Sequence, residues 1–357
     1  MALPTRPLGS SGLHITTVGF GSWAVGGGGW SFGWGPQDDS DSIATMRDAL
    51  DLGINWIDTA AVYGLGHSEE VVGRLLRDLP ASKRPYVFTK CGLIWDSNNP
   101  MVEPRRVLKP DSIRRECEAS LRRLGIERID LYQFHWPDDT GTPVEDSWSE
   151  IVKLMKEGKV RAAGVSNFNT ELLERCEVIR HVDSLQPPFS LINRKAAEKE
   201  IPWCEKHHTG VICYSPMQSG LLTDSFTTLR MAKLADDDWR RRASEFLEPN
   251  LNRNLALRNA LRPIANEERH NGVFGGDRLD TRLAGRDGSD RGSAYASASG
   301  RLDPSRISRA HTRGSTRDCL RSRTHKSGGR PKSPDKSDGL FKGALRLAHI
   351  SDESESE

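Results

Sequence analysis

Four ionisable residues follow short apolar runs in the first half of the chain: Asp58, Tyr63, Lys90 and His135. The stretches NWIDTAAVYG, YVFTKCG and LYQFHW carry them, and in each an apolar run stops at an ionisable group. Catalytic groups gather at one rim of a parallel barrel, where the carboxyl ends of its strands meet. A tyrosine within reach of a lysine and a histidine can donate a proton, so this set indicates carbonyl chemistry.

The composition indicates one large α/β domain without a strongly charged surface. The chain has 357 residues, and its net charge is +2. So small a net charge argues against nucleic acid or a membrane surface as a partner. The chain shows no apolar signal core in its first residues and no long apolar run, so we expect a cytoplasmic protein. Six cysteines without metal-binding spacing predict reduced, buried thiols and no metal site.

Strands and helices alternate along most of the chain, after an opening hairpin that turns at Ser11–Gly12. The expected strands are TTVGFGSW and residues 55–58, 86–89, 129–134, 160–165, 184–186 and 210–214; the expected helices are 40–52, 68–77, 111–124, 144–157, 170–179, 198–207 and 252–268. Strands that are nearly all apolar predict a parallel sheet covered by helices. Because no GxGxxG follows the first strand, a (β/α)8 TIM barrel is favoured over an open doubly wound sheet.

The composition changes after Val273. Residues 274–357 contain no Val, Trp, Met, Asn or Gln and are dense in Arg, Ser, Gly and Asp. Such a segment buries too little apolar area to offset its chain entropy. The sequence therefore predicts an incomplete barrel over residues 1–273 and a low-complexity, disordered tail over 274–357.

Several motifs together resemble the aldo-keto reductases, in particular the bacterial general-stress-protein-like branch. They are NWIDTAAVYGLGHSEEVVGRLL, the KCG strand end, DLYQFHWPD, GKVRAAGVSNF and CYSPMQSGLLT, and the resemblance runs from about Arg6 to Gly272. It implies reduction of an aldehyde or ketone, or oxidation of a sugar-type alcohol, by hydride transfer with NADP(H). The implied partner is thus a small carbonyl or sugar-type molecule.

The resemblance gives each of the four ionisable residues a role. Tyr63 is the general acid that protonates the developing alkoxide, and His135 orients the carbonyl oxygen. A free tyrosine titrates near ~10 and donates poorly at neutral pH. The Lys90 ammonium would lower that value by stabilising the phenolate, and Asp58 would hold Lys90 by a charge-assisted hydrogen bond.

The cofactor contacts also come from the resemblance. Ser166, Asn167 and Gln186 match residues that bond the nicotinamide carboxamide, and Tyr214 matches the aromatic residue that stacks on the nicotinamide ring. The loop that embraces the pyrophosphate, where small residues let backbone N–H groups approach the phosphates, contains Ser215, Met217, Ser219, Gly220 and Leu221.

Tryptophans in or beside the rim loops predict an apolar substrate pocket. We assign Trp23, Trp95 and Trp136 to it, and Trp23 directly follows the first strand. Core packing is the alternative interpretation for each of these side chains.

The family pattern stops near Val273. Members continue into an eighth strand, a Gly-Ala-Arg loop that binds the adenosine 2′-phosphate, and C-terminal helices. Here GGDRLDTRLAGRDGSDRGSAYASASGRLD follows, and it can be encoded so that the neighbouring frame reads VAIAWTLAWPGVTGAIVGARTPQQVDGWI. We infer a frameshift; the alternative is a natural disordered tail whose Arg-rich patches contact nucleic acid.

This departure has consequences for the barrel and for its function. A barrel that lacks its eighth strand and C-terminal helices is expected to leave the edges of its first and seventh strands unpaired. NADP over NAD rests on the family alone, because the residues that decide it are missing. Alternatives to an active reductase are a catalytically impaired or inactive frameshifted product and a non-catalytic cofactor-binding barrel subunit.

Overall fold

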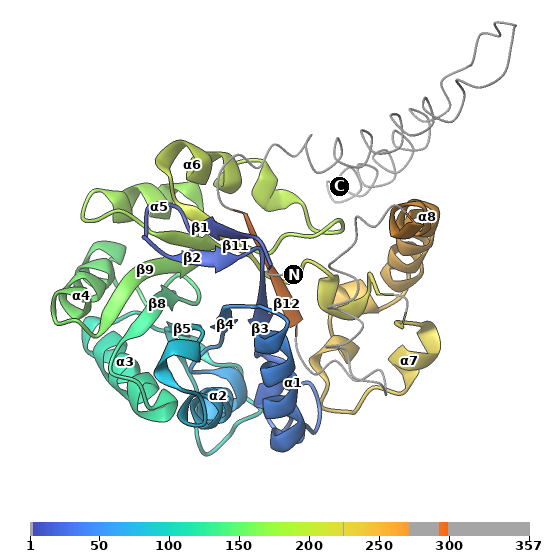
Figure 1. Ribbon diagram of the computed structural model, residues 1–357, viewed down its shortest axis with the longest axis horizontal. Helices are drawn as coiled ribbons and strands as arrows, with labels where there is room; N and C mark the ends of the chain where they lie inside the picture. Colours follow the sequence, from blue (N-terminus) through green and yellow to red (C-terminus); the bar gives the residue numbers. More distant parts are fainter. Residues whose placement is uncertain (1–2, 224, 271–292, 299–357) are drawn as a thin grey trace, which may run out of the picture.

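A closed barrel forms the centre of the computed structural model, which describes residues 3–223, 225–270 and 293–298 (Figure 1). Seven of its strands run parallel, in the spatial order β3, β4, β5, β8, β9, β10 and β11. They are β3 (Val18–Gly21), β4 (Trp56–Asp58), β5 (Tyr86–Cys91), β8 (Ile129–Phe134), β9 (Val160–Ser166), β10 (Ser184–Gln186) and β11 (Gly210–Cys213). The predicted (β/α)8-type architecture is confirmed.

The position between β11 and β3 is occupied in a way that the sequence did not predict. Strand β12 (Ser293–Ala298) pairs there with both neighbours, and it runs antiparallel to each. The expectation that the edges of β3 and β11 are unpaired is therefore wrong. Unpaired edge groups can pair with any extended backbone, because ladder hydrogen bonds do not depend on the side chains. Apart from β12, the predicted tail of residues 274–357 lies outside the described residues. The expected absence of the family's C-terminal helices also concerns that part of the chain.

Helices surround the barrel on its outer side (Figure 1). They are α1 (Asp39–Asp51), α2 (His67–Arg77), α3 (Pro110–Leu124), α4 (Val144–Lys156), α5 (Thr170–Glu177), α6 (Glu200–His207), α7 (Thr228–Ala232) and α8 (Asn250–His270). Local signals set some of their ends. The Asp38 side chain accepts from the backbone N–H of Asp41 at 2.9 Å at the start of α1, and Gly125 ends α3 with a φ of 65°.

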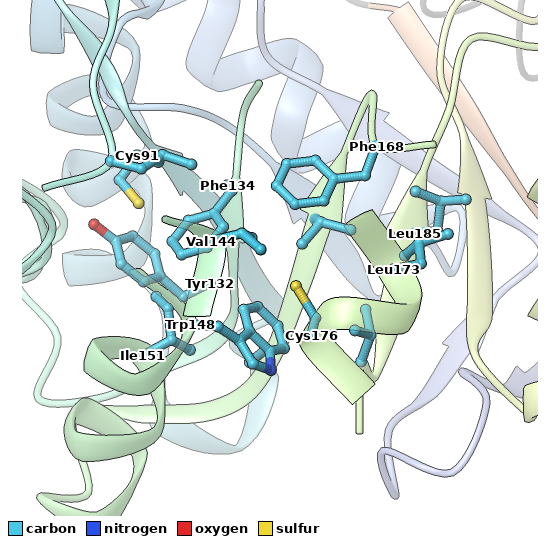
Figure 2. Close-up of a cluster of buried hydrophobic side chains, with 14 of the residues drawn as sticks. Cys91, Tyr132, Phe134, Val144, Trp148, Ile151, Phe168, Leu173, Cys176 and Leu185 are labelled. Carbon is cyan, nitrogen blue, oxygen red and sulfur yellow. The ribbon is translucent and has the colours of Figure 1, made fainter. Parts of the chain in front are cut away.

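The largest apolar cluster lies between the strands and the surrounding helices. Figure 2 shows Tyr132 and Phe134 of β8 close to Trp148 and Ile151 of α4, all of them buried. The alternate residues of each strand point into the barrel, where Phe88 packs in a second cluster. The hairpin of β1 (Thr5–Pro7) and β2 (His14–Thr16) contributes to that inner cluster, so it packs against the barrel interior.

A largely buried carboxyl group on α3 makes the stability of the fold depend on pH. Glu116 accepts a hydrogen bond from the backbone N–H of Gly92 at 2.9 Å, just after β5. Burial raises the pKa of Glu116 from 4.5 to about 7. The folded chain therefore binds this proton more strongly than the unfolded chain does, and the free energy of unfolding should fall as pH rises between about 4.5 and 7.

Glu116→Gln should remove this part of the pH dependence, because the amide does not ionise. Urea unfolding at a series of pH values measures the effect, with the exposed carboxyl variant Glu103→Gln as the control. The same slope in the Glu116→Gln and wild-type proteins would show that another group is responsible.

Candidate active site

The centre of the site is a buried ion pair between neighbouring strands. Asp58 is the last residue of β4, and Lys90 lies near the end of β5. The Lys90 Nζ lies 2.5 Å from Asp58 Oδ2, and both side chains are fully buried. It also donates to the carbonyl oxygen of Thr59 at 2.9 Å. Burial alone would lower the pKa of Lys90, but Asp58 and Tyr63 outweigh it and raise that pKa, so the ammonium persists.

Tyr63 reaches this pair from the turn that follows β4. Its hydroxyl oxygen lies 3.4 Å from the Lys90 Nζ, which donates to it. The turn continues through Gly64, whose φ is 59°. A Cβ at Gly64 would lie 2.2 Å from the carbonyl oxygen of Gly26, so glycine permits the close approach of the two loops.

His135 stands on the other side of Tyr63, directly after β8. The two rings meet edge to face with centroids 5.6 Å apart. A hydrogen bond from the backbone N–H of His135 to the Cys91 carbonyl oxygen, at 2.9 Å, fixes its backbone. Burial and the positive charge of Lys90 hold the pKa of His135 well below its ordinary value. The imidazole is therefore neutral at neutral pH and can donate or accept a hydrogen bond at a carbonyl oxygen.

The four residues matched to the nicotinamide contacts are joined to this set by hydrogen bonds. Ser166 Oγ donates to the Gln186 carbonyl oxygen at 2.7 Å. Asn167 Nδ2 donates to the His135 carbonyl oxygen at 3.0 Å, and the Tyr214 hydroxyl donates to Asn167 Oδ1 at 2.9 Å. The end of β9 thus contacts the end of β8, and the ends of β10 and β11 contact the end of β9.

Gln186 also supports the ion pair. Its Nε2 donates to Asp58 Oδ1 at 2.8 Å, across the barrel from β10 to β4. Asp58 therefore accepts from Lys90 on one oxygen and from Gln186 on the other. The sequence did not predict this contact.

The turn after β11 contains the five residues assigned to the pyrophosphate loop, Ser215, Met217, Ser219, Gly220 and Leu221. Ser215, Ser219 and Gly220 have positive φ values of 52°, 50° and 98°. Successive left-handed residues can turn backbone N–H groups toward an anion. Leu221 differs from the others, because its side chain is fully buried in an apolar cluster with Phe226 and Phe246.

The three assigned tryptophans lie in different surroundings. The Trp23 ring stacks on Tyr63, with centroids 6.0 Å apart and planes at 19°. Trp95 packs against the cluster that contains Tyr63. Trp136 lies under the Arg106 guanidinium, 4.4 Å from ring centroid to Cζ.

One aromatic residue beside Trp23 was missed. Trp239 stacks on Trp23 with centroids 5.1 Å apart, although it lies in the polar run DDDWRRR between β11 and α8. A lone tryptophan in such a run is the signal that could have revealed it.

No group of His, Cys, Asp and Glu side chains that could hold a metal ion occurs in the described part of the chain. The five described cysteines are free and buried, and Cys319 lies outside the described residues. Within those same ranges, no helix has the length and apolar character needed to cross a membrane.

Comparisons with known proteins agree on one family. The Aldo/keto reductase family profile matches residues 17–272. Aldo-keto reductase YhdN of Bacillus subtilis is 34% identical over 258 residues, which is 72% of this chain and 75% of the relative. The NADH-specific methylglyoxal reductase of Escherichia coli is 36% identical over 230 residues, 62% and 69% of the two chains. The solved glycerol dehydrogenase AKR11B4 from Gluconobacter oxydans superposes with a TM-score of 0.65 at 39% identity, covering 75% of this chain and 80% of that one.

Proposed function

Because the chain belongs to the aldo/keto reductase family of oxidoreductases that act on carbonyl compounds, we propose that it reduces small aldehydes or ketones with NADP(H). The reverse reaction, oxidation of a sugar-type alcohol, uses the same groups. One observation carries the proposal: the Lys90 Nζ lies 3.4 Å from the Tyr63 hydroxyl and is paired with Asp58 Oδ2 at 2.5 Å.

In this proposal Tyr63 protonates the carbonyl oxygen. A nearby ammonium stabilises the phenolate that remains, which makes the tyrosine a stronger acid. Lys90 keeps its charge because it is paired with Asp58, and Asp58 in turn is held by Gln186. The neutral imidazole of His135 positions the carbonyl oxygen beside Tyr63.

The nicotinamide cofactor supplies the hydride when it is bound. We propose that Ser166, Asn167 and Gln186 hold its carboxamide and that the Tyr214 ring stacks on it; their connection to His135 supports this. The turn of Ser215, Met217, Ser219, Gly220 and Leu221 would hold the pyrophosphate through its backbone. NADP(H) is proposed as the cofactor, while the NADH-specific relative makes NADH the comparison to test.

The test is reductase activity of the purified chain. Loss of reduced cofactor absorbance is followed with NADPH and with NADH, using methylglyoxal and glyceraldehyde as compact substrates. We expect turnover with a preference for NADPH. Cofactor binding without turnover would instead support a non-catalytic cofactor-binding subunit.

A second candidate is an impaired product of a frameshifted gene. The family match ends at residue 272, and the composition changes at the same place. A chain with the neighbouring frame restored after Val273 should then bind NADPH more tightly and turn over faster than the chain as it stands. Equal activity of the two chains would count against the frameshift.

A further inference from the structure

The segment between β11 and α8 adds an aromatic ring to the wall beside Tyr63. Trp23 stacks with Tyr63 and also with Trp239, at interplanar angles of 19° and 15°. Trp34 meets both indoles edge to face, with centroids 5.3 Å from Trp23 and 5.8 Å from Trp239. An aromatic wall, formed by Trp23, Trp34 and Trp239, therefore extends outward from the Tyr63 ring.

Three hydrogen bonds fix the segment around Trp239 against the loop that follows β3. The backbone N–H of Trp239 donates to the Gly33 carbonyl oxygen at 3.2 Å. Earlier in the chain, Asp237 Oδ2 accepts a hydrogen bond from the backbone N–H of Gly29 at 3.0 Å. Later in the chain, Arg242 Nη2 donates to the Ser31 carbonyl oxygen at 2.6 Å. These contacts hold the backbone of Trp239 in place, and the indole stacks on Trp23.

A buried ion pair packs against the same aromatic wall, next to Trp34. Arg240 and Asp238 are both almost fully buried, and Arg240 donates from Nε and Nη2 to the two oxygens of Asp238 at 3.0 and 2.7 Å. The guanidinium lies over Trp34 at 4.4 Å, and its Nη1 donates to the Ser219 carbonyl oxygen at 3.4 Å. A bidentate pair of this kind fixes orientation more than it adds stability.

We propose that Trp239 is a specificity-determining residue. Its indole completes the aromatic wall beside Tyr63 and so limits the carbonyl substrate to compact aldehydes and ketones. This inference rests on the proposed function. A carbonyl oxygen at Tyr63 places the substituents of the carbonyl carbon next to Trp23 and the indoles packed on it. Rigid rings that already contact one another leave little room for a large substituent, whereas a short one fits.

The experiment compares propanal with 3-phenylpropanal as substrates of the wild-type chain and three variants. Trp239→Ala should raise the kcat/KM ratio of the larger to the smaller aldehyde by about tenfold or more, since removed pocket volume changes discrimination on that scale. Trp239→Phe keeps an aromatic ring and should stay near the wild-type ratio. Leu229→Ala, at an exposed position of α7 in the same segment, is the matched control.

Each outcome decides the inference. A proportional loss for both aldehydes, or no change in their ratio, overturns it while leaving the proposed function intact. Should Trp239→Ala fail to fold, Trp239→Leu takes its place, with the same ratio expected to rise. Should the wild-type chain turn over neither of these aldehydes, nor methylglyoxal, nor glyceraldehyde, the proposed function fails. The binding of 3-phenyl-1-propanol, measured by calorimetry, then tests the size limit that we assign to Trp239. Tighter binding to Trp239→Ala than to wild type supports that limit, and equal binding overturns it.

Discussion

Tyr63→Phe is expected to lower kcat by about 10²–10⁴-fold, the usual contribution of a general acid, while the dissociation constant for NADPH stays near its wild-type value. The substitution removes only the hydroxyl, so the ring can still stack on Trp23. It leaves Lys90 its bonds to Asp58 and to the Thr59 carbonyl oxygen. The measurements are steady-state kinetics and cofactor titration by fluorescence.

The control for this variant is Tyr86→Phe. Tyr86 is the first residue of β5, and its ring packs against Arg161, whose Cζ is 5.6 Å from the ring centroid, and not against Lys90. Its loss of the hydroxyl should leave kcat unchanged. Turnover by Tyr63→Phe at the wild-type rate would exclude Tyr63 as the general acid.

Lys90→Met should abolish turnover and also destabilise the fold by about 3–5 kcal/mol, the effect expected when one partner of a buried pair is removed. The reason is that the Asp58 carboxylate remains fully buried and loses its cation at 2.5 Å. Adding Asp58→Asn to this variant removes the unpaired charge. The double variant should therefore regain much of the lost stability but none of the activity.

Urea unfolding and steady-state kinetics together separate the two effects. Lys159→Met serves as the matched control, because the Lys159 ammonium pairs with Glu118 at 2.8 Å in a partly exposed position. Such a pair contributes about 1 kcal/mol or less. If Lys90→Met were no less stable than Lys159→Met, the Asp58–Lys90 pair would not carry the structural role assigned to it.

The positions of the four ionisable residues could be predicted because the signal is local. Asp58 and Lys90 lie on apolar runs that form buried strands, His135 directly follows one, and Tyr63 lies in the turn after Asp58. Parallel strands bring their carboxyl ends to one rim. Lys90 and Asp58 lie on paired strands, so their contact follows from the predicted order of the sheet. The roles assigned to these residues remain predictions.

Long-range contacts could not be predicted in the same way. The hydrogen bond from Gln186 to Asp58 joins residues 128 positions apart, and no local pattern specifies it. Trp239 lies in an irregular polar segment whose place depends on hydrogen bonds to the loop after β3. The antiparallel pairing of β12 arises because two strand edges were available.

By itself, therefore, the sequence determined the barrel and the residues at its rim, because hydrophobic periodicity places alternate side chains and strand ends without reference to distant segments. Only the tertiary structure decided what supports and encloses those residues: Gln186 behind Asp58, Trp239 on Trp23, and β12 between β3 and β11. Each of these contacts joins segments far apart in the chain, so it forms only when the barrel has closed and packing has fixed its geometry.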